Sequence, residues 1–448
     1  MYNDLMSKAI KQIKNTLRPL IPREALNKYH YPEARLAQLR HKNPSEKMVV
    51  IGVVGSKGKT TTANMIWATL SADGSNVGQI GTANIRIAGH EELNKHHMTM
   101  PNAFILQGYL KRMLAAGCQY VVMEVPSEGQ TQYRHVGINF DVLVFTNVTR
   151  EIMAAHRNSM EVLHQHNKRV FVQMARGRHK IIGGKRIPKI IIANSDAHDA
   201  PAYSGFKADQ KISYSIKSNS DYKAIDVKAS SRGLDFKVNA HPYHLDMLGT
   251  INVINAAGAI ATAFALGKDA PTISKGLASL GPIPGRMEVI DEGQNFTVIV
   301  DYAHEQVSMQ ALMDGANAMK PKGAKIITLL GAEGGGRDVE KRPDMGAIAA
   351  KGSDTIIICN VDPYNDDPIQ IIHDIAKGAE ESGAKLDKDM FCIEDRRKAI
   401  AKALKIASKG DIVLITGKGS EQSMVIGGKK IDWDDRTVVR EELSKLGR

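Results

Sequence analysis

Residues 52–62 read GVVGSKGKTTT and directly follow the apolar run MVVI at positions 48–51. A strand that ends in a glycine turn and continues into a helix forms an anion site, because unpaired backbone N–H groups and the N-terminus of the helix point toward a bound phosphate. The glycines let the backbone approach the phosphates, the lysine can reach the outer phosphates, and a threonine hydroxyl can ligate Mg²⁺. The residues predicted to bind a nucleotide here are Gly55, Ser56, Lys57, Gly58, Lys59, Thr60 and Thr61.

The elements around this loop predict an α/β fold. Helical stretches at 60–70 and 159–174 alternate with apolar strand candidates, and such alternation indicates a mainly parallel sheet covered by helices on both faces. Residues 208–248 differ, because short alternating pieces such as KISYSI and LDFKVNA predict a small antiparallel addition. The strand candidates that follow the first are residues 119–125, 141–148 and 189–194.

A second α/β unit is predicted after GPIPGR at residues 281–286, where two prolines and two glycines in six positions indicate a hinge. Four apolar segments then alternate with helical stretches, which predicts a second doubly wound domain. These segments read TVIVDYAH, KIITLLGAE, DTIIICN and DIVLITG. We therefore predict a short basic leader at 1–47, a central domain built on the phosphate loop at 48–283, and a C-terminal α/β domain at 284–448.

Composition restricts the class of protein. The 448 residues include no apolar run near the roughly 20 residues that span a bilayer, so we expect a cytoplasmic protein. Three scattered cysteines argue against a disulfide framework or a structural zinc site. The formal net charge of +12 lacks aromatic interleaving, so nucleic acid is not an expected partner. We expect a monomer acting on small molecules, with a weak membrane-surface contact through the basic, amphipathic leader as a minor alternative.

The loop resembles a known family. GSKGKTTT departs from the GxxxxGK[ST] pattern at Val53, and is similar to the compressed GTxGKTT version of the Mur ligase family. Members of that family are ATP-dependent ligases that join an amino acid to a carboxylate through an acyl phosphate. The resemblance therefore implies ATP and Mg²⁺ as cofactors.

The resemblance extends through the central region. MEVPSEG at 123–129 is similar to the family's MExSSxG stretch, and TANIRIAG with MTMPNAF is similar to its substrate-side GT…TTP segment. LGTINVINAAG at 248–258 resembles the helix that lies under the adenine. This implies that Glu124 helps to hold magnesium. It also implies nucleotide contacts at Asn252 and Asn255, and substrate contacts at Thr99, Pro101 and Ser127.

The C-terminal region carries further family motifs. GRMEVIDEGQNFTVIVDYAHEQVSM resembles GRxE…DYAHxPxS, GAEGGGRDVEKRPDMG resembles GxGGxRDxxKRxxM, and ITGKGSEQ and WDDR resemble GKGHE and DDR. Within the family, the best match is the branch that adds the third residue of the peptidoglycan stem peptide. The implied nucleotide contacts are Arg286, Asp301, Tyr302 and His304. The implied substrate contacts are Arg337, Asp338, Lys341, Arg342, Lys418 and Glu421, and the terminal motif gives Asp434, Asp435 and Arg436.

One departure concerns the family's second magnesium site, which uses a DHLDxHG segment and a carbamylated lysine. Here Ile152 stands at the first histidine, and His156 matches the second and is a predicted metal ligand and catalytic residue. Asn167 stands at the lysine position with Lys168 one place away, and a shift of one residue on a helix turns a side chain by about 100°. Histidines that could substitute are His164 and His166.

A second departure concerns the amino acid. VDPYNDDP at 361–368 replaces the DNPR of diaminopimelate ligases, so Tyr364 stands where an arginine would pair with the distal carboxylate. An aromatic ring cannot supply that bidentate charge pair. The segment resembles the lysine-type pattern more, with Asp362, Asp366 and Glu421 available to recognise a diamine. The alternative is an acidic loop without a ligand.

The function expected from these motifs is an ATP-dependent amide ligase that acts on a muramyl-peptide-like carboxylate. Phosphoryl transfer needs positioning and neutralisation of charge more than a protein nucleophile, which suits Lys59, magnesium and Glu124. Closure at the hinge would assemble the site and exclude water from the acyl phosphate. Full-length relatives carry a UDP-binding domain of roughly a hundred residues, whereas 47 residues precede the first strand here. The alternatives are a related ligase with another acceptor, as in folylpolyglutamate synthases, and a nucleotide-binding paralogue with impaired catalysis.

Overall fold

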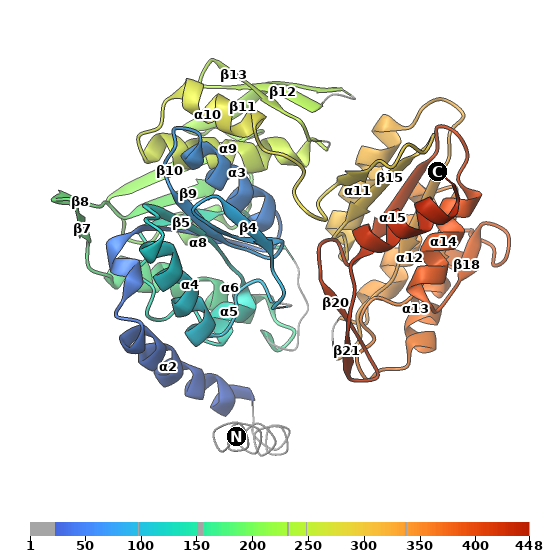
Figure 1. Ribbon diagram of the computed structural model, residues 1–448, viewed down its shortest axis with the longest axis horizontal. Helices are drawn as coiled ribbons and strands as arrows, with labels where there is room; N and C mark the ends of the chain where they lie inside the picture. The colour runs from blue at the N-terminus through green and yellow to red at the C-terminus, as the bar shows by residue number, and fades with distance from the viewer. Residues whose placement is uncertain are drawn as a thin grey trace.

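The computed structural model describes residues 23–96, 98–149, 156–230, 233–247, 249–336 and 338–447. These ranges form two α/β domains that lie side by side, with the long N-terminal helix α2 (Arg23–Arg40) beneath the central domain in Figure 1. Leader residues 1–22, Ile152 and Arg337 lie outside the described residues. The predictions that depend on those residues therefore stay predictions.

The central domain is built on a large sheet. The described residues form eleven strands in the order β13-β12-β11-β10-β9-β6-β1-β5-β2-β3-β4. Every neighbouring pair from β11 to β2 in this order is parallel, which confirms the predicted mainly parallel sheet. At the other end of the sheet, β2, β3 and β4 pair antiparallel. The strands are β1 (Val49–Val54), β2 (Val77–Ile80), β3 (Asn84–Ile87), β4 (His90–Leu93), β5 (Tyr120–Val125), β6 (Val142–Phe145), β9 (Ile190–Asn194), β10 (Gln210–Ser215), β11 (Tyr222–Ser230), β12 (Gly233–Val238) and β13 (His241–Leu245).

The antiparallel prediction for residues 208–248 is wrong in part. The piece KISYSI lies in β10, which runs parallel to both β9 and β11, and within residues 208–247 the antiparallel pairs are β11–β12 and β12–β13. Alternation of apolar and polar residues reports that one face of a strand is exposed. This alternation does not depend on the direction of the neighbouring strands. The sequence of β10 therefore could not distinguish parallel from antiparallel pairing.

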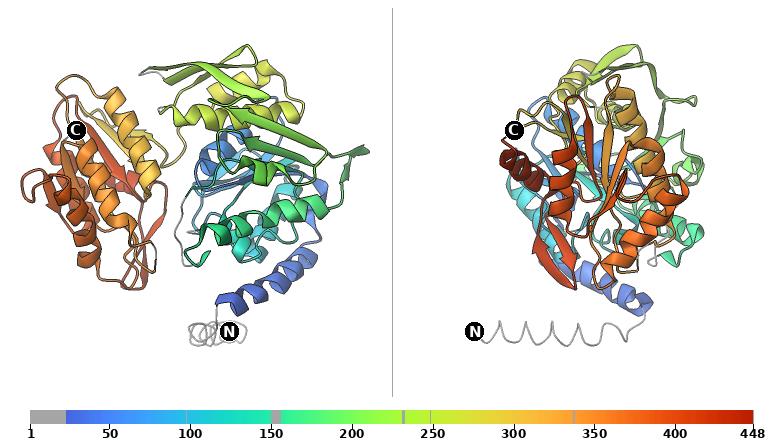
Figure 2. Two further views of the ribbon diagram at one scale, coloured as in Figure 1. Left: turned by 180° about the vertical axis from the view of Figure 1, so that it is seen from behind. Right: turned by 90° about the vertical axis from the view of Figure 1, so that its right-hand side faces the viewer.

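Helices cover both faces of the central sheet and enclose two cores (Figure 2). One core includes α3, α9 and α10, and the other includes α4, α7 and α8. The predicted helix at 159–174 is two short helices with Lys168 between them. The helices and the small hairpin are η2 (Pro44–Lys47), α3 (Lys59–Ser71), α4 (Ala103–Ala115), α5 (Ser127–Thr131), α6 (Met160–Asn167), α7 (Arg169–Arg176), β7 (Ile181–Ile182), β8 (Lys185–Arg186), α8 (Ala200–Ser204), α9 (Ile251–Ala265) and α10 (Ala270–Ala278).

The C-terminal domain has its own sheet, in the order β14-β15-β19-β16-β17-β18. All neighbours except β14 and β15 are parallel, and helices lie on both faces, so the predicted second doubly wound domain is confirmed. The elements are β14 (Glu288–Ile290), β15 (Thr297–Asp301), α11 (Gln306–Met319), β16 (Ile326–Leu330), α12 (Lys341–Gly352), β17 (Thr355–Ile358), α13 (Pro368–Glu381), β18 (Met390–Cys392), α14 (Arg396–Ile406), β19 (Ile412–Thr416), β20 (Ser423–Ile426), β21 (Lys429–Asp432) and α15 (Asp435–Lys445).

The segment at 281–286 joins the two domains, and its end packs against the C-terminal domain. Gly285 has a φ of 63°, a left-handed conformation that favours glycine. A Cβ atom there would lie 2.1 Å from the backbone nitrogen of Ser420, so close approach also requires glycine. The domain boundary at this segment remains our proposal.

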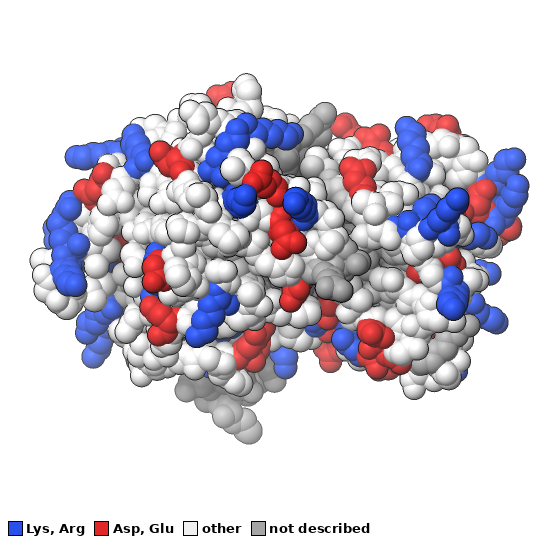
Figure 3. Space-filling view, turned by 90° about the horizontal axis from the view of Figure 1, so that it is seen from above, with Lys and Arg blue, Asp and Glu red and all other residues white. Residues whose placement is uncertain are grey.

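On the face seen in Figure 3, charges of both signs are mixed and do not gather in one patch. Lysine and arginine side chains are interspersed there with aspartate and glutamate. No helix in the described part of the chain is long and apolar enough to cross a membrane.

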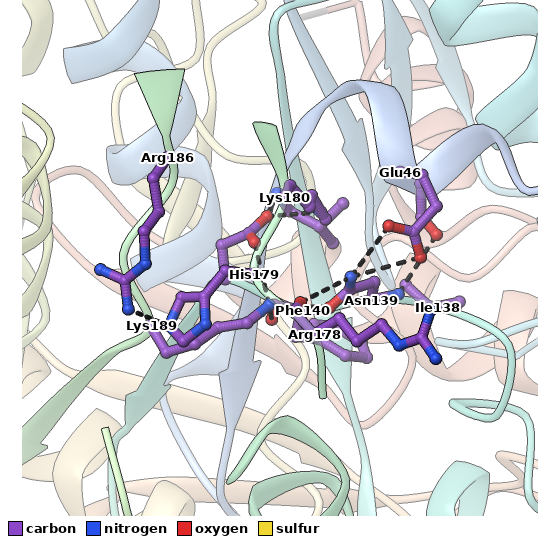
Figure 4. A network of polar contacts seen from close by, with 12 residues as sticks. Glu46, Ile138, Asn139, Phe140, Arg178, His179, Lys180, Arg186 and Lys189 are labelled. Atoms are coloured by element: carbon purple, nitrogen blue, oxygen red, sulfur yellow. Dashed lines mark hydrogen bonds and ion pairs between the residues drawn. The ribbon is translucent and has the colours of Figure 1, made fainter. Parts of the chain in front are cut away.

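Two lysines share one aspartate at the amino ends of β1, β6 and β9 (Figure 4). Asp141 is fully buried and contacts both Lys180 Nζ and, at 3.1 Å, Lys189 Nζ. Lys180 Nζ also donates to the carbonyl oxygen of Met48 at 2.8 Å, and Lys189 Nζ donates to that of Phe140 at 2.6 Å. Desolvation on burial, together with the charge of Lys189, lowers the pKa of Lys180 to about 8, although Asp141 acts in the opposite direction. The network ties the amino ends of these three strands together.

The free energy of unfolding is expected to rise between about pH 8 and pH 10.5 through Lys180. In that window the unfolded chain binds more protons at this amine than the folded chain does, so stability increases with pH. Below pH 8 both states hold the proton and the contribution is constant. Denaturant unfolding of Lys180→Met at several pH values should show a smaller rise than the wild type. Lys185→Met, at an exposed position on β8, serves as the control and should keep the wild-type slope.

Candidate active site

The phosphate loop joins β1 to α3, and its shape requires glycine. Gly58 has a φ of 81°, and a Cβ atom at this position would lie 2.4 Å from Asn255 Oδ1. Asn255 on α9 also accepts a hydrogen bond from Thr62 Oγ1 at 3.4 Å and donates to Asn252 Oδ1 at 3.2 Å. The two asparagines therefore support the loop from α9.

The loop is also held from the end of β6. The backbone N–H of Ser56 donates to Asn147 O at 2.8 Å, and that of Lys57 donates to Asn147 Oδ1 at 3.0 Å. Lys59 Nζ donates to the carbonyl oxygens of Gly55 at 2.7 Å and Ser56 at 2.8 Å, which places the ammonium group across the loop. The start of α3 and the Lys59 ammonium together provide the positive potential that an anion site needs.

Glu124, at the carboxyl end of β5, and Thr60 place two side-chain oxygens next to each other at the first turn of α3. Thr60 Oγ1 lies 2.9 Å from Glu124 Oε2, and the Glu124 side chain is buried. Mg²⁺ binds oxygen ligands at 2.0–2.1 Å in octahedral geometry, so adjacent ligands lie about 3 Å apart. An oxygen pair at this separation fits Mg²⁺, so Thr60 and Glu124 are the residues that would hold the ion.

The C-terminal domain forms the opposite wall of the site. Arg286 donates from its guanidinium group to Thr60 Oγ1 at 3.2 Å, and the guanidinium carbon lies 4.4 Å from the ring centroid of Tyr302. His304 Nδ1 donates to the carbonyl oxygen of Tyr302 at 2.7 Å. Burial lowers the pKa of His304 to about 4, so its ring is neutral at pH 7. The Arg286–Thr60 hydrogen bond connects the two domains at the predicted magnesium ligand.

Lys341, at the start of α12, brings a second cation to this wall. Its Nζ donates to His304 O at 2.9 Å and to Glu305 Oε1 at 2.7 Å, and lies 3.9 Å from Glu333 Oε2. The sequence analysis did not single out either glutamate, because the family patterns quoted above leave positions 305 and 333 unspecified. They make this wall less positive than the motifs alone indicate.

One cleft between the domains brings together fourteen of the predicted residues from its two walls. The predicted residues that line it are Ser56, Lys57, Gly58, Lys59, Thr60, Thr61, Thr99, Glu124, Ser127, Arg286, Tyr302, His304, Asp338 and Lys341. Other residues that line it, which the sequence analysis did not single out, are Thr82, Pro126, Glu128, Glu305 and Glu333. The described residues predicted for the site that do not line it are Gly55, Pro101, His156, Asn252, Asn255, Asp301, Arg342, Asp362, Tyr364, Asp366, Lys418 and Glu421.

His156 lies in a buried cluster next to the cleft. Its Nε2 contacts Ser127 Oγ at 3.0 Å, and its Nδ1 lies 2.8 Å from His166 Nδ1. Asn167 is fully buried and accepts a hydrogen bond from Gln130 at 3.4 Å, whereas the Lys168 ammonium lies 5.8 Å from the ring centroid of Tyr203. Within the described ranges, no group of three or more His, Cys, Asp and Glu side chains is placed to hold a metal ion. The metal role of His156 thus remains a proposal.

The acidic residues predicted to bind a diamine have protein partners. Lys418 Nζ lies 2.6 Å from both Asp362 Oδ2 and Glu421 Oε2, and the lysine side chain is fully buried. Burial alone would lower the pKa of Lys418, but the carboxylates of Glu421 and Asp362 raise it above its usual value. Asp366 accepts a hydrogen bond from the backbone N–H of Gly335 at 3.0 Å. The structure brings Lys418, Asp362 and Glu421 together as a buried ion cluster.

Two predicted residues near the C-terminal motifs lie inside the domain. Arg342 donates to Asp374 at 2.8 Å and to the carbonyl oxygen of Glu333 at 3.2 Å. Asp435 is fully buried and pairs with Arg396. A motif search cannot separate such internal pairs from ligand contacts, because both use the same charged residue types.

Comparison with known families decides between the possible nucleotide-binding classes. The Mur ligase middle domain matches residues 53–263, and the domain described as Mur ligase, glutamate ligase domain matches residues 285–419, together more than half of the chain. The chain belongs to the Mur ligase family. Members of this family are ATP-dependent amide ligases that form ADP, and they generally use Mg²⁺.

Named relatives resemble this Mur ligase over most of its length. The UDP-N-acetylmuramoyl-L-alanyl-D-glutamate–2,6-diaminopimelate ligase of Geobacillus kaustophilus is 33% identical over 418 residues, which cover 92% of this chain and 82% of the relative. The UDP-N-acetylmuramyl-tripeptide synthetase of Roseiflexus sp. is 34% identical over 428 residues, with the same coverage of 92% and 82%.

Solved structures show the same architecture. A UDP-N-acetylmuramoyl-L-alanyl-D-glutamate–2,6-diaminopimelate ligase matches with a TM-score of 0.59 and 26% identity, covering 90% of this chain and 79% of that one. A Mycobacterium tuberculosis folylpolyglutamate synthase matches with a TM-score of 0.68 and 16% identity, covering 98% and 99%. The second likeness shows the fold alone.

Proposed function

We propose that this Mur ligase adds an amino acid to the terminal carboxylate of a muramyl-peptide-like acceptor, with ATP and Mg²⁺, in the synthesis of peptidoglycan precursors. The relatives named above as tripeptide synthetase and diaminopimelate ligase support this branch of the family. Both walls of the cleft come from one chain, so the proposed reaction needs no second copy. We place the reaction in the cytoplasm, where ATP is available.

The observation that carries the proposal is the cleft in which the phosphate loop faces the C-terminal domain. Arg286 reaches Thr60, and the cleft is lined on one side by Lys59 and on the other by Lys341. A phosphoryl group between Lys59 and Arg286 would meet positive charge on both sides, whereas Glu305 and Glu333 offset the charge of Lys341. Such a site serves transfer of the γ-phosphate better than simple storage of a nucleotide.

The proposed chemistry has two steps. An oxygen of the acceptor carboxylate attacks the γ-phosphorus, and the bond to the bridging oxygen breaks to release ADP. The amine of the incoming amino acid then attacks the acyl carbon, and the bond from that carbon to the phosphate oxygen breaks. The proton from the amine passes to the departing inorganic phosphate. Lys59 and Arg286 would stabilise the negative charge on the transferred group, and Thr60 and Glu124 would hold Mg²⁺, which neutralises the phosphate oxygens.

The acceptor would lie on the Thr99 and Ser127 side of the cleft. Both side chains line the cleft with Glu124, so an acceptor carboxylate held there would be close to the metal ligand. The C-terminal wall would exclude water and limit hydrolysis of the acyl phosphate. The contact between Arg286 and Thr60 supports closure across this cleft.

The amino acid is expected to lack a distal carboxylate, because Tyr364 replaces the arginine of the DNPR motif. L-Lysine should therefore give a higher kcat/KM than meso-diaminopimelate. Tyr364→Arg should raise kcat/KM for meso-diaminopimelate by about tenfold or more, since a hydrogen-bonded charge pair contributes about 1.5–3 kcal/mol. Amine-dependent phosphate release measures both substrates, with Tyr364→Phe as the matched control. Preference of the wild type for meso-diaminopimelate would show that Tyr364 does not set the specificity.

A further inference from the structure

Thr82, directly after β2, contacts residues from two other segments of the cleft. Its backbone N–H donates to Glu124 Oε1 at 2.7 Å, and its hydroxyl donates to Glu124 Oε2 at 3.0 Å. The same hydroxyl lies 2.9 Å from Thr99 Oγ1. Thr82 is thus the one described residue for which hydrogen bonds to both Glu124 and Thr99 are recorded.

The direction of the hydrogen bonds follows from counting protons. A hydroxyl group has one proton to donate and can accept through its lone pairs, whereas a carboxylate only accepts. The Thr82 proton is directed to Glu124, so the Thr99 hydroxyl must donate to Thr82. The result is a chain of hydrogen bonds that runs from Thr99 through Thr82 to Glu124.

The position of the Glu124 carboxylate depends on this short loop. Its Oε2 also accepts from Thr60 Oγ1 at 2.9 Å, and a Cβ atom on Gly81 would lie 2.5 Å from Oε1. The carboxylate is therefore packed against residues 81 and 82 and oriented by them. Groups that hydrogen-bond to a metal-binding carboxylate typically change metal affinity by about 10–100-fold when they are removed.

We propose that Thr82 is a positioning residue that couples the acceptor-side hydroxyl of Thr99 to the magnesium-side carboxylate of Glu124. The inference rests on the proposed function, because it assigns the acceptor to Thr99 and the metal to Glu124. When Thr99 donates its proton to the carboxylate of the acceptor substrate, Thr82 no longer receives a hydrogen bond from Thr99. Hydrogen bonds in a chain polarise one another, so the Thr82 donation to Glu124 then weakens. The carboxylate becomes a better metal ligand, and acceptor and metal strengthen each other's binding.

The test measures metal binding directly on the full chain. Mn²⁺ is titrated in the presence of ADP and followed by electron paramagnetic resonance, with and without UDP-N-acetylmuramoyl-L-alanyl-D-glutamate. In the wild type, the acceptor should lower the Mn²⁺ dissociation constant several-fold. Thr82→Val removes the hydroxyl donation to Glu124, so it should bind Mn²⁺ without the acceptor as tightly as the acceptor-bound wild type does, and the acceptor should have no further effect. Thr82→Ser should retain both wild-type properties.

The control is Thr262→Val, which removes a buried hydroxyl far from these residues in sequence, bonded to Gly258 O at 2.7 Å. It should leave Mn²⁺ binding and the acceptor effect unchanged, and circular dichroism checks that all variants fold. The proposal would be overturned if Thr82→Val had the Mn²⁺ dissociation constant and acceptor effect of the wild type. It would also be overturned if Thr82→Ser gave the same values as Thr82→Val. The titration does not depend on turnover, so its result is separate from that of the ligation assay, whose failure would count against the proposed function.

Discussion

Lys59→Ala is expected to lower phosphate release that depends on both acceptor and amine by about 10²-fold or more. The Lys59 ammonium is held across the phosphate loop by Gly55 O and Ser56 O, at the start of α3. Removing it leaves the developing charge on the transferred phosphoryl group with one fewer cation. A preorganised charged group in a site from which water is excluded contributes more to the transition state than the same group in water.

The measurement is steady-state phosphate release at saturating ATP, acceptor and amino acid. Lys275→Ala, at an exposed position on α10, is the matched control and should retain wild-type turnover. Thermal unfolding of both variants separates loss of chemistry from loss of fold. Turnover of Lys59→Ala within a few-fold of the wild type would contradict the role assigned to this loop.

Arg396→Ala is expected to lower the free energy of unfolding of the C-terminal domain by about 3–5 kcal/mol. Arg396 and Asp435 are both fully buried, with Nε to Oδ1 at 2.8 Å and Nη2 to Oδ2 at 2.6 Å. Arg396 also donates to the carbonyl oxygens of Thr416 at 2.7 Å and Asn360 at 3.2 Å. The truncation leaves a carboxylate buried without its partner, which costs far more than loss of an exposed ion pair.

Denaturant unfolding monitored by circular dichroism gives the change in stability. The adjacent Arg397 pairs with Glu441 and Glu442 but is 40% exposed, so Arg397→Ala should cost only about 0–1 kcal/mol. Arg396→Met combined with Asp435→Leu removes both charges and should recover much of the loss. Equal effects of the two arginine truncations would show that burial does not determine the contribution of the Arg396 pair.

The phosphate loop and the two sheets could be predicted because their signals are local. Glycine, lysine and threonine at fixed spacing behind an apolar run fix the loop at Gly55 to Thr61, and α3 begins at Lys59 as the pattern requires. The four strand candidates of the C-terminal domain are β15, β16, β17 and β19 in the structure. The direction of β10 was not predictable, because pairing direction depends on the path of the chain between strands and not on the strand's own residues.

The partners of the charged residues could not be predicted. Asp362 and Glu421 have the residue types of a cation-binding site, but the fold places Lys418 between them. Thr82 opens the segment TANIRIAG that resembles the family's GT…TTP stretch, but its hydrogen-bond partners lie 17 and 42 positions away along the chain and could not be read from that stretch. Family motifs identify which residues recur, whereas the contacts that divide them between binding and structural roles form only in the folded chain.

The central claim is that this Mur ligase activates a carboxylate as an acyl phosphate, and an isotope experiment tests it directly. The terminal carboxylate of UDP-N-acetylmuramoyl-L-alanyl-D-glutamate is labelled with ¹⁸O and incubated with the enzyme, ATP, Mg²⁺ and L-lysine. Mass spectrometry then measures the released inorganic phosphate. The account predicts that each phosphate carries one ¹⁸O atom from the acceptor, because the acyl carbon–oxygen bond breaks when the amine attacks. Amide formation accompanied by unlabelled phosphate would contradict it.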